Sequence, residues 1–320
     1  MKEILLLGTG GTIAEVSRDG KAIMLTASEL VASVGPISSI ASVRAIDFLR
    51  VPSPAIQFTD LLNLSSTVQK ELKKGKPDGV IVTMGTDTLE ESAYFLDLTV
   101  ETSVPLVVTG AMRSRIDPSS DTDYNLECAV RAASSDSLRD LGAVVVMNGE
   151  IHHARYVSKT NTGSVGSFQS PGFGPLGVIS GEKVMLNNTL VSRQHVTADN
   201  VGARVDLIRC CVGLDGSPVE AAVRMGAKGI VIEGFGGGDV TLSMVPAVRE
   251  ALAQGVAVVL VSRCITGPIV QPALDFEGSP SSLAKDGVII ASNTSGVKAR
   301  IKLTLALSAG LKGKRLKSLF

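Results

Sequence analysis

The sequence predicts an α/β fold: an N-terminal domain built on a doubly wound, mostly parallel sheet, followed by a second, smaller α/β domain. Short runs of β-branched residues alternate with segments of helical periodicity, a pattern typical of parallel sheets covered by helices. The chain has 320 residues, more than one domain usually contains and enough to bury a core without disulfides. Only 3% of the residues are aromatic and 33 are glycine, which suits close packing of helices on such a sheet.

Five strands are expected in the N-terminal domain: EILLL (3–7), SVRAIDFL (42–49), DGVIVTM (78–84), PLVVT (105–109) and GAVVVM (142–147). Helical patterns lie between them, over residues 26–34, 58–75, 87–98 and 121–134. Thr26 and Glu29 have the spacing of a capping box, and Asp87 with Glu90 repeats it. Gly75 stands where a helix C-cap is expected. These signals fix two helix starts and one helix end.

The alternation lapses from Ile151 to about Asn200, where Gly, Ser and Asn predict irregular structure. It then resumes, with strands expected at 205–210, 229–235, 256–262 and 287–292 and helices at 218–229, 244–255 and 297–309. We therefore expect a catalytic domain over residues 1–190, a linker over 191–204 and a C-terminal domain over 205–320.

Composition excludes several classes of protein. The chain has 31 basic and 31 acidic residues, so no net field favours nucleic acid or an anionic membrane. The basic end, LKGKRLKSLF, is interpreted as a frayed, solvated tail. The first apolar run, Ile4 to Leu7, is too short for a signal-peptide core, and no later run is long enough to cross a bilayer. We expect a cytoplasmic protein.

Cysteine and histidine give no metal site by their spacing. The cysteines form no C-x-x-C pair and are expected to be reduced core thiols: Cys128, Cys210, Cys211 and Cys264. The adjacent His152 and His153 cannot hold a metal alone, and we expect them to be exposed in a loop. No Ser/His/Asp arrangement is evident among the three histidines of the chain.

The first strand ends in the glycine-rich loop GTGGTIA (8–14). It matches a dinucleotide fingerprint at two glycines, but Ile13 occupies the third position, and no Gly-Lys-Ser/Thr of a P-loop follows. A structural turn explains the glycines but leaves the threonines among them unexplained. The loop leaves the carboxyl end of its strand, the edge at which open α/β sheets bind ligands.

A second loop has the same layout, because strand 78–84 ends in Met84-Gly85 and is followed by Thr86 and Asp87. Alone, this stretch fits a helix cap at Asp87 as well as an active site. Two Gly-Thr loops after neighbouring parallel strands favour the second interpretation, because both hydroxyl groups and the carboxylate then converge on one crevice.

A threonine nucleophile needs a base, and a desolvated lysine can serve because burial lowers the pKa of an ammonium group. Lys159, in VSKTNTG, is the candidate, lying among small polar residues of a glycine-rich stretch. A lysine in such surroundings is more commonly a solvated surface residue, so both interpretations stay open on the sequence alone.

Six segments together resemble the bacterial-type L-asparaginase/glutaminase family. They occur in family order: TGGTIA (9–14), GTDT (85–88), GAMRS (110–114), KTNT (159–162), GPLG (174–177) and KAR (298–300). The resemblance spans essentially the whole chain. It implies hydrolysis of a side-chain carboxamide, of L-asparagine or a related small amide, to acid and ammonia through an acyl-enzyme, without metal or cofactor.

The resemblance also assigns roles. Thr12 is implied to be the nucleophile, on a mobile loop. Thr86, Asp87 and Lys159 are implied to form a second catalytic group. The implied substrate-binding residues are Asp87, which would hold the substrate's ammonium, and the backbone near Gly11, Gly85 and Ala111. The site is implied to lie at the carboxyl edge of the N-terminal sheet and to be completed by a neighbouring subunit of a homodimer or homotetramer.

The sequence departs from the family around the substrate. An ungapped count places Leu25 where the family has a tyrosine, and Ala55-Ile56 where it has a Ser-Gln clamp, with Ser53 as the nearest replacement hydroxyl. Met84 replaces a histidine that often precedes GTDT. In the C-terminal domain Asp239 takes an asparagine position. Asp275 and Glu277 are both candidates for the acidic residue that a partner subunit supplies.

These departures leave four functions to compare. An amidohydrolase acting on asparagine explains the retained Thr12, Thr86, Asp87 and Lys159. The lost hydrogen-bonding groups favour a hydrolase of the same fold redirected to another amide. A non-catalytic amino-acid-binding or sensor protein is a third possibility, which the retained residues disfavour. A nucleotide-binding dehydrogenase is disfavoured by Ile13.

Overall fold

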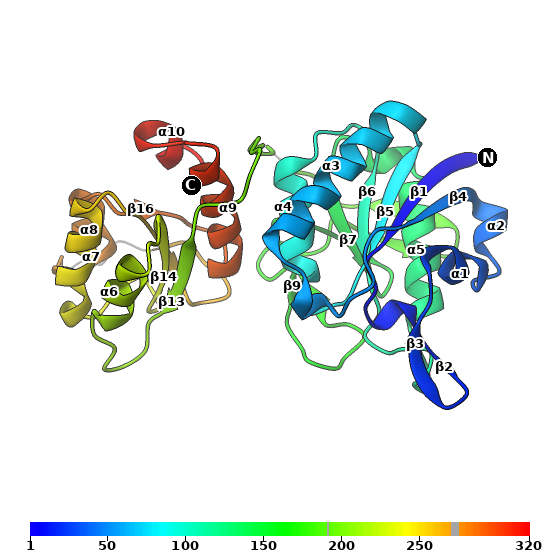
Figure 1. Cartoon of the computed structure of the whole chain (residues 1–320), viewed down its shortest axis with the longest axis horizontal. Coiled ribbons are helices and arrows are strands. Elements are labelled where there is room, and N and C mark those ends of the chain that lie inside the picture. The colour runs from blue at the N-terminus through cyan, green and yellow to red at the C-terminus, as the bar shows by residue number, and fades with distance from the viewer. Residues whose placement is uncertain (191, 270–274) are drawn as a thin grey trace. The chain divides into compact units, whose positions relative to one another are not determined.

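The computed structural model describes residues 1–190, 192–269 and 275–320. The chain folds as two compact units, an N-terminal unit over Met1–His195 and a C-terminal unit over Val196–Phe320 (Figure 1). Each unit is an α/β structure, the N-terminal one with an eight-stranded sheet and the C-terminal one with a four-stranded sheet. The expected fold class is confirmed.

The main sheet of the N-terminal unit has the order β12-β11-β8-β7-β6-β5-β1-β4. Its parallel part contains β1 (Lys2–Gly8), β4 (Ala41–Asp47), β5 (Gly79–Thr83), β6 (Leu106–Thr109) and β7 (Ala143–Met147). These are the predicted strands. Antiparallel strands extend the sheet beyond β7: β8 (Glu150–His153), β11 (Gly177–Ser180) and β12 (Lys183–Leu186).

Helices cover both faces of this sheet (Figure 1). One face packs on α3 (Phe58–Gly75) and α4 (Leu89–Thr99), the other on α1 (Ala27–Ala32), α2 (Ile37–Ile40) and α5 (Thr122–Ala133). Because successive strand residues point to opposite faces, Leu5 and Leu7 enter the core under α3 and α4, whereas Ile4 and Leu6 enter the other. Both faces are buried, which explains the continuous apolar runs of these strands.

The helix signals are met in part. Thr26 and Glu29 form the capping box, with the Glu29 amide donating to Thr26 Oγ1 at 3.1 Å and the Thr26 amide to Glu29 Oε2 at 2.8 Å. Gly75 belongs to α3 itself, and the left-handed residue that ends the helix is Lys76, at φ 44°. The N-cap of α4 is Thr88, so Asp87 is free of the capping role.

The expectation of irregular structure after Ile151 is wrong in part, because short antiparallel strands occupy much of it. Besides β8, β11 and β12, a small ribbon pairs β9 (Ser158–Lys159) with β10 (Phe168–Gln169). The turn from β7 to β8 is Asn148-Gly149, with φ of 51° and 75°, as in two-residue hairpins. These strands lack long apolar runs because they are short and in places buried on one side only.

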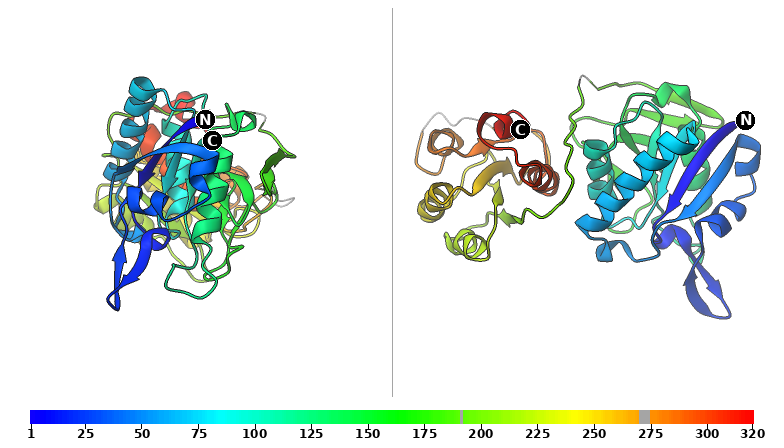
Figure 2. Two further views of the ribbon diagram at one scale, coloured as in Figure 1. Left: turned by 90° about the vertical axis from the view of Figure 1, so that its right-hand side faces the viewer. Right: turned by 45° about the horizontal axis from the view of Figure 1, so that its top comes forward.

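A hairpin that the sequence pattern does not predict follows the first glycine loop. It pairs β2 (Glu15–Arg18) with β3 (Lys21–Met24) across Asp19-Gly20, both at positive φ, and extends away from the rest of the N-terminal unit (Figure 2). A short 3₁₀ turn, η1 (Thr12–Ala14), precedes it. The hairpin is therefore the structure that follows the first Gly-Thr loop.

The sheet of the C-terminal unit is parallel, in the order β13-β14-β15-β16. Its strands are β13 (Val205–Arg209), β14 (Gly229–Gly234), β15 (Ala257–Ser262) and β16 (Ile289–Ile290). Its helices are α6 (Ser217–Arg224), α7 (Val245–Ala253), α8 (Pro280–Asp286), α9 (Gly296–Ser308) and α10 (Gly313–Lys317). Three 3₁₀ turns complete the described elements of the chain: η2 (Ser53–Ala55), η3 (Asp136–Leu138) and η4 (Leu242–Met244).

The C-terminal segment is ordered, so the expectation of a frayed tail is wrong. Leu316 of α10 is buried, and Lys302 of α9 donates from Nζ to the Leu319 carbonyl at 2.7 Å. The same ammonium lies 4.9 Å from the centre of the Phe320 ring. The basic residues of this segment remain exposed around an apolar contact that the composition alone concealed.

The burial of the cysteines and of two histidines corrects two further expectations. Cys128 and Cys210 are buried thiols as predicted, but Cys211 and Cys264 are exposed. His152 and His153 lie on β8 with 0% and 1% exposure, rather than in an exposed loop. They are hydrogen-bonded there, His152 Nδ1 to Ser170 Oγ at 3.0 Å and His153 Nε2 to the Leu141 carbonyl at 3.0 Å.

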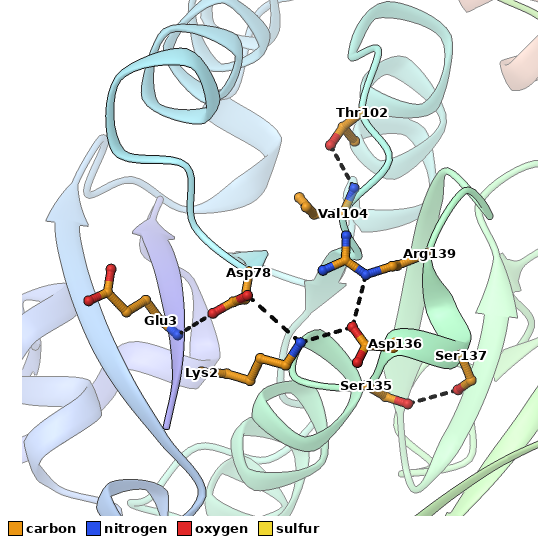
Figure 3. A network of polar contacts seen from close by, with 9 residues as sticks. All are labelled: Lys2, Glu3, Asp78, Thr102, Val104, Ser135, Asp136, Ser137 and Arg139. Carbon is orange, nitrogen blue, oxygen red and sulfur yellow. Dashed lines mark hydrogen bonds and ion pairs between the residues drawn. The ribbon is translucent and has the colours of Figure 1, made fainter.

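A network of charged side chains connects the amino ends of β1 and β5 with the segment before β7 (Figure 3). Lys2 Nζ lies 2.9 Å from Asp136 Oδ1 and 3.7 Å from Asp78 Oδ1, and Arg139 donates to Asp136 at 2.8 Å. Exposed pairs of this kind contribute little to the free energy of unfolding, because water and salt screen them. They lie at the edge of the sheet opposite to the glycine loops.

Within the described ranges, no helix combines the length and apolar character that crossing a membrane requires.

Candidate active site

The two Gly-Thr loops touch at the carboxyl edge of the main sheet, where β1 and β5 are neighbours. Gly11 has φ +80°, and a β-carbon placed on it would lie 2.2 Å from the Gly85 nitrogen and 2.3 Å from its Cα. No side chain can occupy that space, so glycine is required at position 11. The residues after these glycines, Thr12 and Thr86, are consequently held on loops in direct backbone contact.

Ser53 lies beside the two Gly-Thr loops, and we call the residues around these loops the cluster. It begins the 3₁₀ turn η2, is 3% exposed, and its Oγ would lie 2.8 Å from a β-carbon on Gly85. Its carbonyl accepts a hydrogen bond from Thr88 Oγ1 at 3.2 Å. Ala55 is exposed and Ile56 packs against the core under α3 and α4. Of the predicted binding residues in this segment, the structure places Ser53 against Gly85.

Thr12 is presented by the turn η1, which the Ala14 amide closes by donating to the Gly11 carbonyl at 2.9 Å. The β2–β3 hairpin then brings Leu25 back beside this turn, where its amide donates to the Ala14 carbonyl at 2.8 Å. The Leu25 side chain is 8% exposed and packs in the same core cluster as Ile13. Leu25 therefore supports the turn by packing and brings no hydroxyl group to it.

Lys159 joins Thr86 and Asp87 into one polar group. Its Nζ donates to Thr86 Oγ1 at 2.9 Å and to Asp87 Oδ1 at 2.6 Å. The Lys159 side chain is 17% exposed, Thr86 is 8% exposed as a whole residue, and the Asp87 side chain is 62% exposed. The alternative in which Lys159 is a solvated surface residue does not describe it. Asp87, in the loop after β5, forms an ion pair with Lys159 and does not cap a helix.

The ribbon β9–β10 positions Lys159. Lys159 pairs with Phe168, whose side chain is 1% exposed, and the following Thr160 amide donates to the Ser167 carbonyl at 2.7 Å. Gln169 extends this anchoring, because its Nε2 donates to Glu150 Oε2 at 3.2 Å on β8. The lysine thus reaches the two loops from a braced antiparallel ribbon.

A third loop, after β6, completes the cluster. A β-carbon on Gly110 would lie 2.7 Å from the Met84 carbonyl oxygen and 3.2 Å from Thr86 Cγ2. Ala111 follows and is fully buried. The Met84 side chain is itself buried in the core under α3 and α4 with Leu89, so only its backbone faces the loops. The exchange of histidine for methionine at position 84 therefore falls within the core.

The remaining predicted residues belong to the C-terminal unit. One oxygen of Asp239, Oδ1, is buried without a hydrogen-bond partner among the described residues. Asp275 accepts from Lys285 Nζ at 2.8 Å, and this contact, with hydroxyl donors from two serines, lowers the pKa of Asp275 well below its usual range. Glu277 lies 3.3 Å from Arg249, with its side chain 68% exposed.

The cluster has the groups that acyl transfer requires: hydroxyl nucleophiles, a lysine–carboxylate pair and glycine backbone amides at strand ends. Among the residues that the structure describes, no group of three or more His, Cys, Asp or Glu side chains could hold a metal ion. No role was assigned to Thr88 from the sequence, yet its hydroxyl donates to the Ser53 carbonyl. Its position in GTDT, directly before a helix, was the available signal.

Comparisons with known proteins agree with these motifs. The family model described as "Asparaginase, N-terminal" matches residues 3–192, and "Glutaminase/Asparaginase C-terminal domain" matches residues 204–320. An L-asparaginase of Bacillus licheniformis is 38% identical, covering 98% of this chain and 97% of its own. A probable periplasmic L-asparaginase of Haemophilus influenzae is 34% identical, covering 96% of this chain and 89% of its own.

A solved structure gives the same result for the fold. The crystal structure of a probable cytoplasmic L-asparaginase from Campylobacter jejuni superposes with a TM-score of 0.89 at 31% identity, covering 99% of this chain and 98% of that one. The resemblance inferred from TGGTIA and GTDT is confirmed. With both of its domains matched by family models, the chain belongs to the asparaginase family.

Proposed function

We propose that this asparaginase-type amidohydrolase cleaves the side-chain carboxamide of L-asparagine to L-aspartate and ammonia, through an acyl-enzyme on Thr12. The observation that carries the proposal is the contact of Lys159 Nζ with Thr86 Oγ1 at 2.9 Å and Asp87 Oδ1 at 2.6 Å, on a loop in backbone contact with that of Thr12. The relatives named L-asparaginase support the choice of substrate.

In the first half-reaction the Thr12 oxygen bonds to the amide carbon. The hydroxyl proton passes through the Thr86–Lys159 pair to the leaving nitrogen, the C–N bond breaks and ammonia departs. In the second half-reaction a water molecule adds to the acyl carbon, gives a proton to the same pair and releases the acid, so Thr12 regains its hydrogen. The short hydrogen bond from Lys159 to Thr86 supports this proton path, since transfer requires contact at hydrogen-bond distance.

Two other groups complete the proposal. Backbone amides near Gly11, Gly85 and Ala111 stabilise the oxyanion, and each such donor typically lowers the barrier by about 3 kcal/mol. Asp87 uses Oδ1 for Lys159, and its exposed side chain is also available to a substrate ammonium. Ser53, against Gly85, supplies a hydroxyl to the substrate. No cofactor is needed, because hydrolysis of an amide transfers protons and an acyl group only.

We further propose a cytoplasmic homodimer or homotetramer in which Asp275 or Glu277 of a neighbouring subunit completes the site. Both side chains are exposed, Glu277 at 68% and Asp275 at 46%, although each pairs with a cation of its own chain, Arg249 and Lys285. The cytoplasmic assignment follows the Campylobacter jejuni relative, against the periplasmic one from Haemophilus influenzae.

Ammonia release tests the mechanism. With L-asparagine, Thr86→Ala and Lys159→Met are each expected to lower kcat about 10²- to 10⁴-fold, the range for loss of a proton-transfer group. Thr12→Ala is expected to lower kcat at least as much. Thr59→Ala, an exposed threonine on α3, is the matched control and should keep wild-type kcat. Retention of kcat within twofold by Thr12→Ala would refute the acyl-enzyme on that residue. A wild type that binds amino acids but releases no ammonia from any amide would instead support a sensor.

A second candidate keeps the chemistry but changes the substrate. Leu25 is apolar and packed beside the Thr12 turn, and Ala55 and Ile56 replace the Ser-Gln clamp, so three polar side chains of the family are missing. Each unpaired polar group of a bound substrate costs on the order of 1–3 kcal/mol. Under this candidate another small amide has a higher kcat/KM than L-asparagine. If L-asparagine ranks first in a panel that includes L-glutamine and D-asparagine, the redirected-substrate idea is wrong.

A further inference from the structure

We propose that Asn125 is a positioning residue, which holds the Gly110–Ala111 backbone against Thr86 and so keeps the Thr86 hydroxyl directed at Lys159. The inference rests on the proposed function, because it concerns the same proton-transfer pair. It assigns to Asn125 no contact with the substrate.

Asn125 lies in the first turn of α5, is 0% exposed and is fully hydrogen-bonded. Its Nδ2 donates to the Gly110 carbonyl at 3.1 Å and to Asp121 Oδ2 at 2.9 Å. Its Oδ1 accepts from the Asn148 amide at 2.8 Å. The side chain therefore connects the loop after β6, the turn after β7 and the start of α5, and it cannot rotate without breaking all three bonds.

Asp121 extends the same support along the loop. Its Oδ2 accepts from the Met112 amide at 3.1 Å and its Oδ1 from the Arg113 amide at 2.8 Å, and the residue is 8% exposed. The backbone from Gly110 to Arg113 is thus held by one carboxamide and one carboxylate that are bonded to each other. Buried networks of this kind fix a single backbone position, because breaking one bond leaves a buried polar group unpaired.

The support reaches Thr86 because Gly110 lies close to the methyl group of that threonine. Gly110 has no room for a β-carbon, which would come within 3.2 Å of Thr86 Cγ2 and 2.7 Å of the Met84 carbonyl oxygen. On the other side, Lys159 Nζ is 2.9 Å from Thr86 Oγ1. The methyl and hydroxyl of a threonine turn together about χ1, so the wall that confines the methyl also sets the hydroxyl direction.

The isosteric substitution Asn125→Asp tests this role. It replaces the amide donor with an oxygen that faces the Gly110 carbonyl and the Asp121 carboxylate, so both attractive contacts become repulsive when the new carboxyl group is ionised. In its protonated form the carboxyl group has one O–H to donate again. Burial beside Asp121, the charged side chain hydrogen-bonded to position 125, favours that neutral form and raises the pKa of the introduced acid.

The variant is compared with wild type in kcat, KM and free energy of unfolding between pH 5 and 8. At pH 8 we expect kcat of Asn125→Asp to fall about ten- to a hundredfold while KM changes little, the effect of a small misplacement near the reacting groups. Relative to wild type, kcat should recover as the pH falls. Asn125→Ser, which does not titrate, should show the loss without the recovery, and it replaces the first variant as the test if that one fails to fold.

Asp97→Asn is the matched control. Like Asn125, Asp97 is buried and accepts a hydrogen bond from a backbone amide. The donor is the Ala143 amide, at 3.1 Å, which lies at the amino end of β7. This substitution should lower the free energy of unfolding and leave kcat near wild type. Unchanged kcat in both Asn125 variants would overturn the inference alone. A wild type that releases no ammonia would remove the proposed function and the inference with it.

Discussion

At the scale of single residues, Lys159 shows how much chemistry depends on neighbours distant in sequence. Its local sequence, VSKTNTG, is typical of a solvated loop, and 73 residues separate it from Thr86. The β9–β10 ribbon and Phe168 bury it, and no local sequence pattern predicts either of them. The motif resemblance found this residue, whereas composition and periodicity favoured a surface role. Asn125 was missed entirely, because a buried asparagine gives no signal in a helical pattern.

The cysteines give a prediction at this scale. Cys211 and Cys264 are exposed, whereas burial raises the pKa of Cys128 and of Cys210 to about 11 in each case. Thiolate is the reactive form, so the two buried thiols should resist alkylation at pH 8. Peptide mapping after iodoacetamide treatment should find label on Cys211 and Cys264 in native protein and on all four cysteines after denaturation. Rapid native labelling of Cys128 would contradict the described packing of α5.

At the scale of elements, the parallel strands could be predicted because both of their faces are buried. Val80, Ile81 and Val82 are all 0% exposed, and such runs stand out in any sequence. The hairpins could not be found by apolar content, since β2–β3 is largely exposed. Their turns did carry a signal, Asp19-Gly20 and Asn148-Gly149, which are residue pairs that tolerate positive φ. Turn chemistry was the better guide in those segments.

The capping box of α1 predicts a pH dependence. The hydrogen bond from the Thr26 backbone, with further bonds from the Thr26 hydroxyl and Arg18, lowers the pKa of Glu29 from 4.5 to about 2. The stabilisation by ionised Glu29 is therefore present above pH 4.5 and is lost as the pH falls towards 2. The difference in free energy of unfolding between wild type and Glu29→Gln should be constant near neutrality and shrink over that interval. Urea titrations at several pH values measure it, and a difference independent of pH would contradict the assignment.

At the scale of the whole molecule, the chain divides into two units with the boundary between His195 and Val196. The linker over 191–204 stays a prediction in its detailed limits. The catalytic candidates, Thr12, Thr86 and Lys159, all belong to the N-terminal unit. The C-terminal unit contributes the acidic candidates Asp275 and Glu277. No sequence pattern could choose between them, because the proposed site that one of them completes would lie on another copy of the chain.

Subunit complementation tests that assignment. Thr12→Ala and Glu277→Ala are each expected to lower activity, and mixing them through a denaturation–refolding cycle should restore part of it. In a symmetric dimer half of the products are mixed, and one of the two sites in each mixed dimer is intact, so about a quarter of wild-type activity is expected. The same experiment with Asp275→Ala decides between the two acids. Recovery with neither would contradict the proposal that one of these acids completes the site of another subunit.

The segment that carries Lys159 leaves the sheet after His153 and returns to it beside Ile151. The Leu176 amide donates to the Ile151 carbonyl at 2.7 Å, and Gly177 pairs with Ile151, so the intervening residues form an excursion closed at its base. Its buried Val157 and Phe168 pack in the core under α3 and α4, whereas residues 160–164 between them are exposed and can change in length or sequence without disturbing the sheet. Laboratory grafts between Ala154 and Leu176 that keep Val157 and Phe168 would therefore exchange the proposed proton-transfer lysine together with its ribbon and leave Thr12 where it is.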